Sequence, residues 1–177
     1  GGSDPDRFRY YDVTNTADWT ATFVAGDWVS GIATVRASYK TSEVPLTFSM
    51  SVNGQPKDHV SPAVEWYDGP VYFFSIEPDT TSPTAGDSVT LTIEAHDRYW
   101  NLKQAWDGSG TTVQLRQSGA SVPVNISYSS GISDLGTGDG QFSTSDWTSG
   151  QAVVVVSYNR ADDPVNFTVF IDGVKHR

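Results

Sequence analysis

The 177-residue sequence contains no cysteine, few basic residues and no long apolar run. The lack of cysteine excludes disulfides and thiol catalysis, and it favours a cytosolic protein or a bacterial or archaeal surface protein over a small secreted eukaryotic module. Lys and Arg number 11 against 21 Asp and Glu, a formal net charge of -10. A phosphate backbone or an anionic membrane surface would repel such a chain, so we expect no nucleic-acid partner. No apolar run reaches the roughly 20 residues of a membrane helix, so we expect no membrane insertion of this segment.

Apolar and polar residues alternate with a period of two along much of the chain, which predicts β-strands. In the segment 88–95, Val89, Leu91, Ile93 and Ala95 alternate with Ser, Thr and Glu. This is the pattern of a strand with one face on a core and the other in water. Asn-Gly and Asp-Gly pairs, which suit tight turns, separate such runs. Strands are predicted near 8–13, 20–25, 31–39, 46–52, 71–77, 87–96, 111–117, 122–128, 140–144, 151–158 and 165–171.

Residues 27–54 recur at 146–173 with a constant offset of 119, and eleven of the 28 aligned positions are identical. Self-similarity at a fixed spacing indicates a repeat architecture. A period of 119 in 177 residues leaves one complete repeat and about half of another, so we predict a partial or atypical module at 1–60 (equivalent to 120–177), a linker at 61–70 and a complete module at 71–177. The positions shared by the repeats are expected to be structural; they include Trp28 and Trp147, Gly31 and Gly150, and Tyr39 and Tyr158.

The segment DTTSPTAGDSVTLTIEAHDR at 79–98, followed by Tyr99-Trp100-Asn101, resembles the bacterial immunoglobulin-like repeats of surface adhesins of the invasin and intimin type. Those repeats open with a Pro-Thr-Ala-Gly-rich turn and an alternating strand, and continue with an Asp-x-Tyr-Gly-Asn loop. Here Trp100 stands where the family usually has glycine. The sequence GQFS at 140–143 resembles the family's Gly-Thr-Phe-Ser element. The resemblance implies an all-β fold of tandem immunoglobulin-like β-sandwich modules, the N-terminal one short or incomplete, in an extracellular cell-surface protein.

Tyr99, Trp100 and Trp106 lie in one predicted loop region and are the candidate ligand-binding residues. Tryptophan and tyrosine rings supply large contact areas that stack on the apolar faces of sugars, so this group would suit a carbohydrate-binding module. The alternative is that these rings pack in the core or between modules.

Asp134 and Asp139 lie in a glycine-rich loop and are the candidate metal ligands. Hard cations such as Ca²⁺ take several oxygen ligands from loops of this kind. The downstream Glu of an EF-hand loop is missing, and the alternative is a turn between two strands. No other cofactor is expected.

The histidines stand at 59, 96 and 176, and they form no recognisable spacing with a nucleophile and an acid. Catalysis needs a nucleophile or base together with a group that orients it. We therefore predict that this chain is not an enzyme.

The partial module at 1–60 leaves three alternatives: its strands pack on the complete module, a neighbouring chain donates strands to it, or it closes into a small sandwich alone. We expect a non-enzymatic, extracellular structural or adhesive module of a prokaryotic surface protein. Its partners would be neighbouring modules or copies of itself, and self-assembly by strand complementation into filaments or a surface layer is one form of this role. The alternative is a carbohydrate-binding accessory module that holds a glycan with exposed Trp and Tyr side chains.

Overall fold

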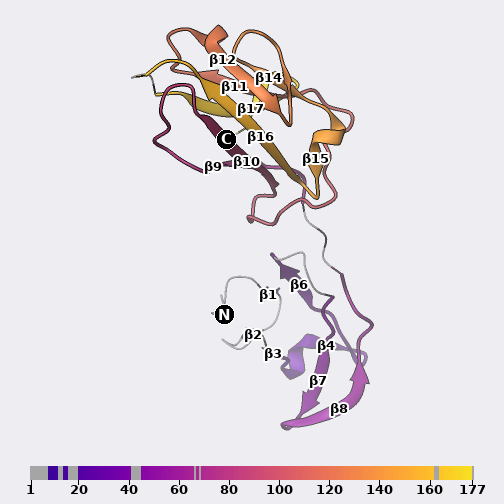
Figure 1. The fold of residues 1–177 in the computed structure, drawn as a ribbon. Coiled ribbons are helices and arrows are strands. Elements are labelled where there is room, and N and C mark those ends of the chain that lie inside the picture. Colours follow the sequence, from indigo (N-terminus) through magenta and orange to yellow (C-terminus); the bar gives the residue numbers. More distant parts are fainter. Residues whose placement is uncertain are drawn as a thin grey trace. The chain divides into compact units, whose positions relative to one another are not determined.

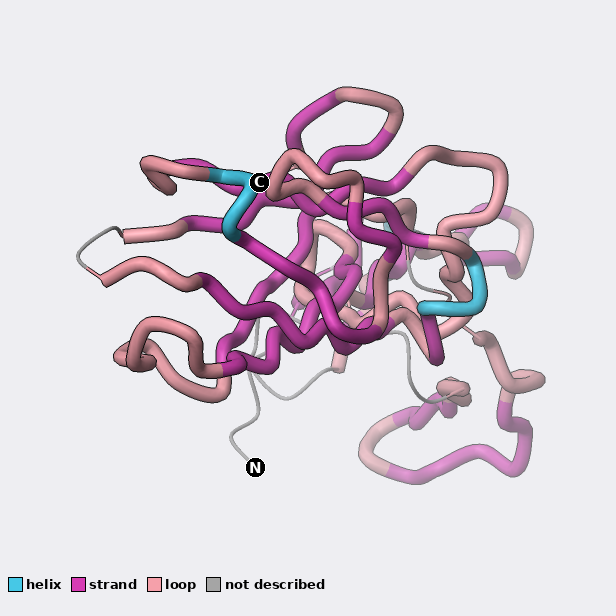
Figure 2. Tube along the Cα trace, turned by 45° about the horizontal axis from the view of Figure 1, so that its top comes forward, coloured by secondary structure: helices cyan, strands magenta, loops and turns pink. Residues whose placement is uncertain are grey.

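The computed structural model describes residues 8–11, 14–15, 20–40, 45–65, 67, 69–161 and 164–176. The chain divides into two compact units, Gly1–Asp68 (unit 1) and Gly69–Arg177 (unit 2). The boundary falls within the segment 61–70, where the sequence analysis places a linker. The described residues form antiparallel strands connected by loops and by short 3-10 turns, as Figures 1 and 2 show. The prediction of an all-β chain is confirmed.

Unit 2 consists of two five-stranded antiparallel sheets. In the first sheet the strands lie in the order β12 (Ile126–Ser130), β16 (Gln151–Tyr158), β10 (Ser88–His96) and β9 (Phe73–Pro78), with β15 (Trp147–Thr148) attached to β16. In the second sheet the order is β13 (Ser133–Asp134), β14 (Gly140–Phe142), β11 (Val113–Ser118), β17 (Asn166–Ile171) and β18 (Val174–Lys175). Each sheet therefore joins strands from both halves of the unit's sequence.

One hydrophobic core in unit 2 unites the two sheets. Leu91, Ile93 and Ala95 on β10 are 3%, 0% and 0% exposed, which confirms the alternation predicted for that strand. They belong to the same buried cluster as Leu115 and Val169 of the second sheet. Burial of apolar side chains from both sheets is the main stabilising term of such a sandwich.

Unit 1 consists of four two-stranded antiparallel sheets among its described residues (Figure 1). No hydrophobic side chain described in this unit is fully buried. The sequence analysis predicts no strand at 55–60, yet the structure has one there, and Pro56 is accommodated in it because an edge strand tolerates proline. The pairs are β1 (Phe8–Tyr11) with β6 (Arg36–Tyr39), β2 (Thr14–Asn15) with β3 (Ala21–Thr22), β4 (Trp28–Val29) with β5 (Ile32–Ala33), and β7 (Ser49–Val52) with β8 (Gln55–Val60).

Local structure in unit 1 repeats that of unit 2 at the offset of 119 residues. The 3-10 turn at Ala25–Asp27 corresponds to the one at Thr144–Asp146. The hairpin β2–β3 corresponds to β13–β14 in the same pairing register. Aligned turn residues also share positive φ angles: Ser30 and Ser149 (51° and 51°), Gly31 and Gly150 (80° and 76°), Asn53 and Asp172 (52° and 49°), Gly54 and Gly173 (74° and 78°).

In chain order, the strands of unit 1 are counterparts of β12 to β18. The ladder β1–β6 matches the ladder β12–β16, which carries a β-bulge between Tyr128 and Ser130. No counterpart of β9, β10 or β11 exists among the residues described in unit 1. Strand by strand, β1 corresponds to β12, β2 to β13, β3 to β14, β4 to β15, β5 and β6 to the two ends of β16, β7 to β17, and β8 to β18.

Candidate functional site

The loop after β10 is organised by the carboxylate of Asp97, which is 2% exposed. Its Oδ1 accepts hydrogen bonds from the backbone N–H of Tyr99 (2.7 Å) and of Asn101 (3.0 Å). Its Oδ2 accepts from Asn101 Nδ2 (2.8 Å) and from the backbone N–H of Gly69 (3.2 Å). Burial alone would raise the pKa of Asp97, but the hydrogen bonds from Asn101, Tyr99 and Gly69 outweigh it and hold the pKa below its ordinary value. The ionised carboxylate therefore fixes the shape of the loop.

This loop presents two aromatic side chains to solvent. Trp100 is 70% exposed and Tyr99 is 42% exposed. Trp100 has a φ of 68°, in the left-handed region where a bulky residue is an outlier. Its ring packs edge-on against Phe73 (centroids 4.4 Å apart) and lies 5.5 Å from His96, while Arg98 lies over the Tyr99 ring at 4.6 Å. Strained backbone conformations cluster at functional sites, and here the strained residue holds an exposed indole in a fixed orientation.

His96 lies beneath this loop and is 7% exposed. Its Nε2 is 3.2 Å from Ser75 Oγ and also 3.2 Å from Glu94 Oε2, while its Nδ1 is buried with no hydrogen-bond partner. In a catalytic triad the nucleophile and the orienting acid contact different nitrogens of the imidazole. Here both groups share one nitrogen, so the three side chains do not have the geometry of a triad.

Trp106 lies elsewhere, in the core of unit 2. Its ring contacts Phe74 (5.3 Å) and Trp147 (4.5 Å), and it packs against the buried cluster. Phe73 and Phe74 are adjacent on β9 and therefore point to opposite faces of the sheet. Since Trp100 packs on Phe73 and Trp106 on Phe74, the two tryptophans lie on opposite faces. The predicted cluster of three ligand-binding aromatics is thus divided, and Trp106 takes the packing role that the sequence analysis kept as its alternative.

Asp134 is the last residue of β13, and Asp139 lies in the turn just before β14. Asp134 Oδ1 accepts the backbone N–H of Gly136 (2.7 Å), and Asp139 Oδ1 accepts that of Gln117 (3.1 Å). Burial, and then the negative charges of the two carboxylates, raise the pKa of the Tyr128 hydroxyl. In the part of the chain that the structure describes, no group of three or more His, Cys, Asp or Glu is placed to hold a metal ion. The Asp134 carboxylate therefore has a turn-forming contact and that of Asp139 a contact with β11, and Ca²⁺ binding at this loop stays a prediction.

The repeat tryptophans differ sharply in burial. Trp147 is 6% exposed and Trp28 is 42% exposed. Trp147 contacts Phe142 at 5.0 Å, and Trp28 contacts Phe23, the aligned residue, at 5.8 Å. Both units therefore contain the aromatic pair, but among the described residues only in unit 2 is its tryptophan also enclosed by further aromatic rings, those of Phe74 and Trp106.

The other repeat positions show the same contrast. A Cβ added at Gly150 would clash with the carbonyl oxygen of Lys103, whereas one added at Gly31 would meet nothing within 4 Å. Tyr158 lines a cavity in unit 2, and Tyr39 pairs with β1. The structure assigns these residues to the scaffold of each unit.

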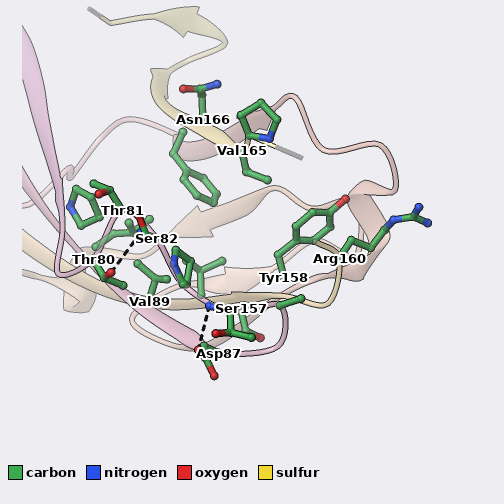
Figure 3. A pocket seen from close by; sticks show the side chains of 18 of the residues that line it. Thr80, Thr81, Ser82, Asp87, Val89, Ser157, Tyr158, Arg160, Val165 and Asn166 are labelled. Carbon is green, nitrogen blue, oxygen red and sulfur yellow. Dashed lines mark hydrogen bonds between the residues drawn. The ribbon is translucent and has the colours of Figure 1, made fainter. Parts of the chain in front are cut away.

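A cavity of about 760 Å³ opens at one end of unit 2, framed by the loops that follow β9 and β16 (Figure 3). Its apolar lining includes Val89, Val165 and Phe167, and two lining residues are charged, Asp87 and Arg160. Sequence reasoning does not find this cavity, because its lining comes from the ends of strands far apart in the chain. The Pro-Thr-rich turn at 79–85 is the one signal in the sequence that marks its rim.

Comparisons of this chain with protein-family models, with curated proteins and with solved structures find no match. Among the described residues, no helix has the length and apolar character needed to cross a membrane. Two structural features are candidates for contact with a partner: the exposed indole of Trp100 in unit 2 and the exposed apolar side chains of unit 1, such as Trp28 and Met50.

Proposed function

We propose that this chain is a non-enzymatic structural or adhesive segment of a prokaryotic surface protein, built from immunoglobulin-like sandwich modules in tandem. The observation that carries the proposal is the repeat of strands, turns and positive φ angles between units 1 and 2. Repeated β-modules are typical of stalks and spacers, in which each module contacts its neighbours. The absence of cysteine fits a prokaryotic surface protein as well as it fits a cytosolic one, and it disfavours a small secreted eukaryotic module.

Strand complementation is the form of contact that unit 1 favours. Each of its strands belongs, within the described residues, to a sheet of only two strands. An isolated two-stranded hairpin is marginally stable in water, and a long open edge readily pairs with a further strand. We therefore propose that a neighbouring module supplies strands to unit 1.

Labelling of intact cells of the source organism tests the surface assignment. Antibodies raised against residues 69–177 should label intact cells as strongly as permeabilised cells, and external protease should remove the epitope. Labelling that requires permeabilisation would overturn the surface role.

A second candidate function is carbohydrate binding through Trp100 and Tyr99. The observation that favours it is the exposed, strained indole held by the Asp97 turn. An aromatic face fixed before binding loses little conformational entropy when a sugar ring stacks on it.

Affinity electrophoresis in gels that contain polysaccharides tests this candidate. Retardation of the chain should be lost in Trp100→Gly, which keeps the positive φ, and retained in Trp28→Ala, which removes an exposed tryptophan from unit 1. Equal retardation of both variants and the unmodified chain, or none in any gel, would exclude the Trp100 site.

A further inference from the structure

Unit 1 has three strand edges that carry no partner strand among the described residues, although their counterparts in unit 2 do. In unit 2, β16 pairs along seven residues with β10. The strands β14 and β17 both pair with β11, which lies between them. The unit 1 counterparts are β5 and β6, β3, and β7, and each forms only a two-stranded sheet. We call these three edges, with the apolar side chains beside them, the acceptor surface.

Side chains of the acceptor surface are exposed where their counterparts are buried. Met50 on β7 is 44% exposed, and its counterpart Val169 on β17 is 1% exposed. Trp28 is 42% exposed, against 6% for Trp147. The aligned residues are apolar in both units and their local backbone agrees. The difference in exposed fraction therefore comes from the strands and side chains that cover these positions in unit 2.

Unit 2 shows what the cover is. Trp147 is enclosed by Phe74 of β9 at 6.0 Å and by Trp106 of the segment between β10 and β11 at 4.5 Å. Val169 pairs directly with Leu115 of β11. All the missing contacts come from a single stretch, residues 69–118. The residues described in unit 1 hold no equivalent of that stretch. In the sequence, the counterpart of unit 1 runs from Gly119, which aligns with Gly1 at an offset of 118 (GGSDPDR against GASVPVN).

We propose that the acceptor surface binds a three-stranded polypeptide segment of the β9–β11 type, which completes unit 1 as a sandwich. The inference rests on the proposed function and names the partner of unit 1. The segment carries the alternating apolar residues that fill the core in unit 2. Its first two strands would extend the sheet of β5 and β6, and its third strand would lie between β3 and β7. Its binding is β-augmentation combined with core completion.

A second copy of the same 177 residues does not satisfy this requirement. Each chain holds one segment of the β9–β11 type, at 69–118, and two acceptors for it, at 8–60 and 126–176. Exchange of segments between copies leaves one uncovered acceptor per chain, whatever the pairing. Copies of these 177 residues therefore cannot cover every acceptor, and the donor is a segment of the β9–β11 type from outside them.

A fusion tests the proposal on the full chain. A second copy of residues 69–118 is placed directly before Gly1, which reproduces the junction between Ser118 and Gly119 in unit 2. Amide hydrogen exchange at 28–39 and 49–52 should slow by at least about 100-fold, toward the rates of the counterparts at 147–158 and 168–171. The matched control carries Leu91→Asp and Ile93→Asp in the added copy only, and it should leave exchange in unit 1 as fast as in the unfused chain.

Three outcomes would overturn the proposal. The first is unchanged exchange in unit 1 of the fusion while unit 2 stays protected. The second is equal protection by the fusion and by its Asp-substituted control. The third is a dimer or polymer of the unfused chain in which 28–39 is already protected, since a second copy would then be the occupant. Surface labelling of cells is independent of all three results, so failure here and failure of the proposed function are separable.

Discussion

Replacing Trp147 by alanine should destabilise unit 2 by about 3 kcal/mol. The ring is 6% exposed and is packed among Phe74, Trp106 and Phe142 at centroid distances of 6.0, 4.5 and 5.0 Å. An aromatic side chain that buries about 200 Å² at about 25 cal/mol per Å² contributes up to about 5 kcal/mol, and core Trp-to-Ala changes cost about 3–5 kcal/mol. The indole N–H of Trp147 is buried with no hydrogen-bond partner. Because an unpaired buried donor costs about 1–3 kcal/mol, the net loss should lie at the lower end.

Trp28→Ala is the matched control, because Trp28 holds the same repeat position in unit 1. Its ring is 42% exposed and contacts Phe23 at 5.8 Å. We expect the free energy of unfolding of unit 1 to fall by about 1 kcal/mol. The loss is smaller than for Trp147 because about half of the Trp28 ring is already exposed to water and its removal leaves no closed cavity.

Urea unfolding followed by resolved amide resonances of each unit measures both effects. With a slope of about 1–3 kcal/mol/M, Trp147→Ala should lower the unit 2 midpoint by about 1–3 M, and Trp28→Ala should leave that midpoint unchanged. Equal shifts for the two variants would refute the reasoning, because residues 69–118 cover Trp147 in unit 2 and nothing equivalent covers Trp28 among the described residues of unit 1.

Further substitutions at Trp100, Gly150, Gly31 and Asp97 have defined outcomes. Trp100→Gly should be more stable than Trp100→Ala by about 1 kcal/mol in thermal unfolding, because glycine adopts the φ of 68° without strain; equal stability would mean that the loop relaxes in the alanine variant. Gly150→Ala should cost well over 2 kcal/mol in urea, since the new Cβ meets a backbone carbonyl, whereas Gly31→Ala should cost only the positive-φ term of about 1 kcal/mol. Asp97→Asn should destabilise unit 2 at pH 7. Since the folded pKa of Asp97 is depressed, its contribution is present above the unfolded pKa of about 3.9 and disappears as pH falls through the lower folded pKa. The gap in urea midpoint between this variant and the unmodified chain should therefore shrink below pH 4, and a constant gap would contradict the role given to the ionised carboxylate.

Sequence patterns predict the elements whose structure depends on near neighbours. The alternation of β10 identifies the buried faces of Leu91 and Ile93, and the Asn-Gly pair at 53–54 forms a tight turn in unit 1 as Asp-Gly does at 172–173. These turns form in both units although only unit 2 has a packed core, so the local sequence is sufficient to specify them.

Features that depend on distant strands are not predicted. Trp100 and Trp106 are close in sequence, yet they lie on opposite faces of β9. Trp100 packs on Phe73 at the outer face, and Trp106 packs on Phe74 at the core. The exposure of Met50 likewise follows from the lack of a strand equivalent to β11 beside β7 among the described residues, although the alternating apolar pattern at 46–52 predicts burial. The cavity at the end of unit 2 depends on strand ends that only the folded sheets bring together.

The position of β11 between β14 and β17 has a consequence for the order of folding. The hairpins β13–β14 and β17–β18 connect residues close in sequence, and such hairpins form in about 1–10 μs. β11 must instead pair with β17 across about fifty residues, for example Gln117 with Phe167, so its loop-closure entropy must be offset before any core forms. β10 pairs with β16 across a similar or longer separation, so we expect pairing of these distant strands to be the slow step for unit 2. Leu115→Ala should then slow refolding in stopped-flow experiments more than Val174→Ala does. Among its described residues, unit 1 holds counterparts of the local hairpins of unit 2 but none of the strands β9, β10 and β11, so its strands pair only with partners close in sequence or across β1–β6.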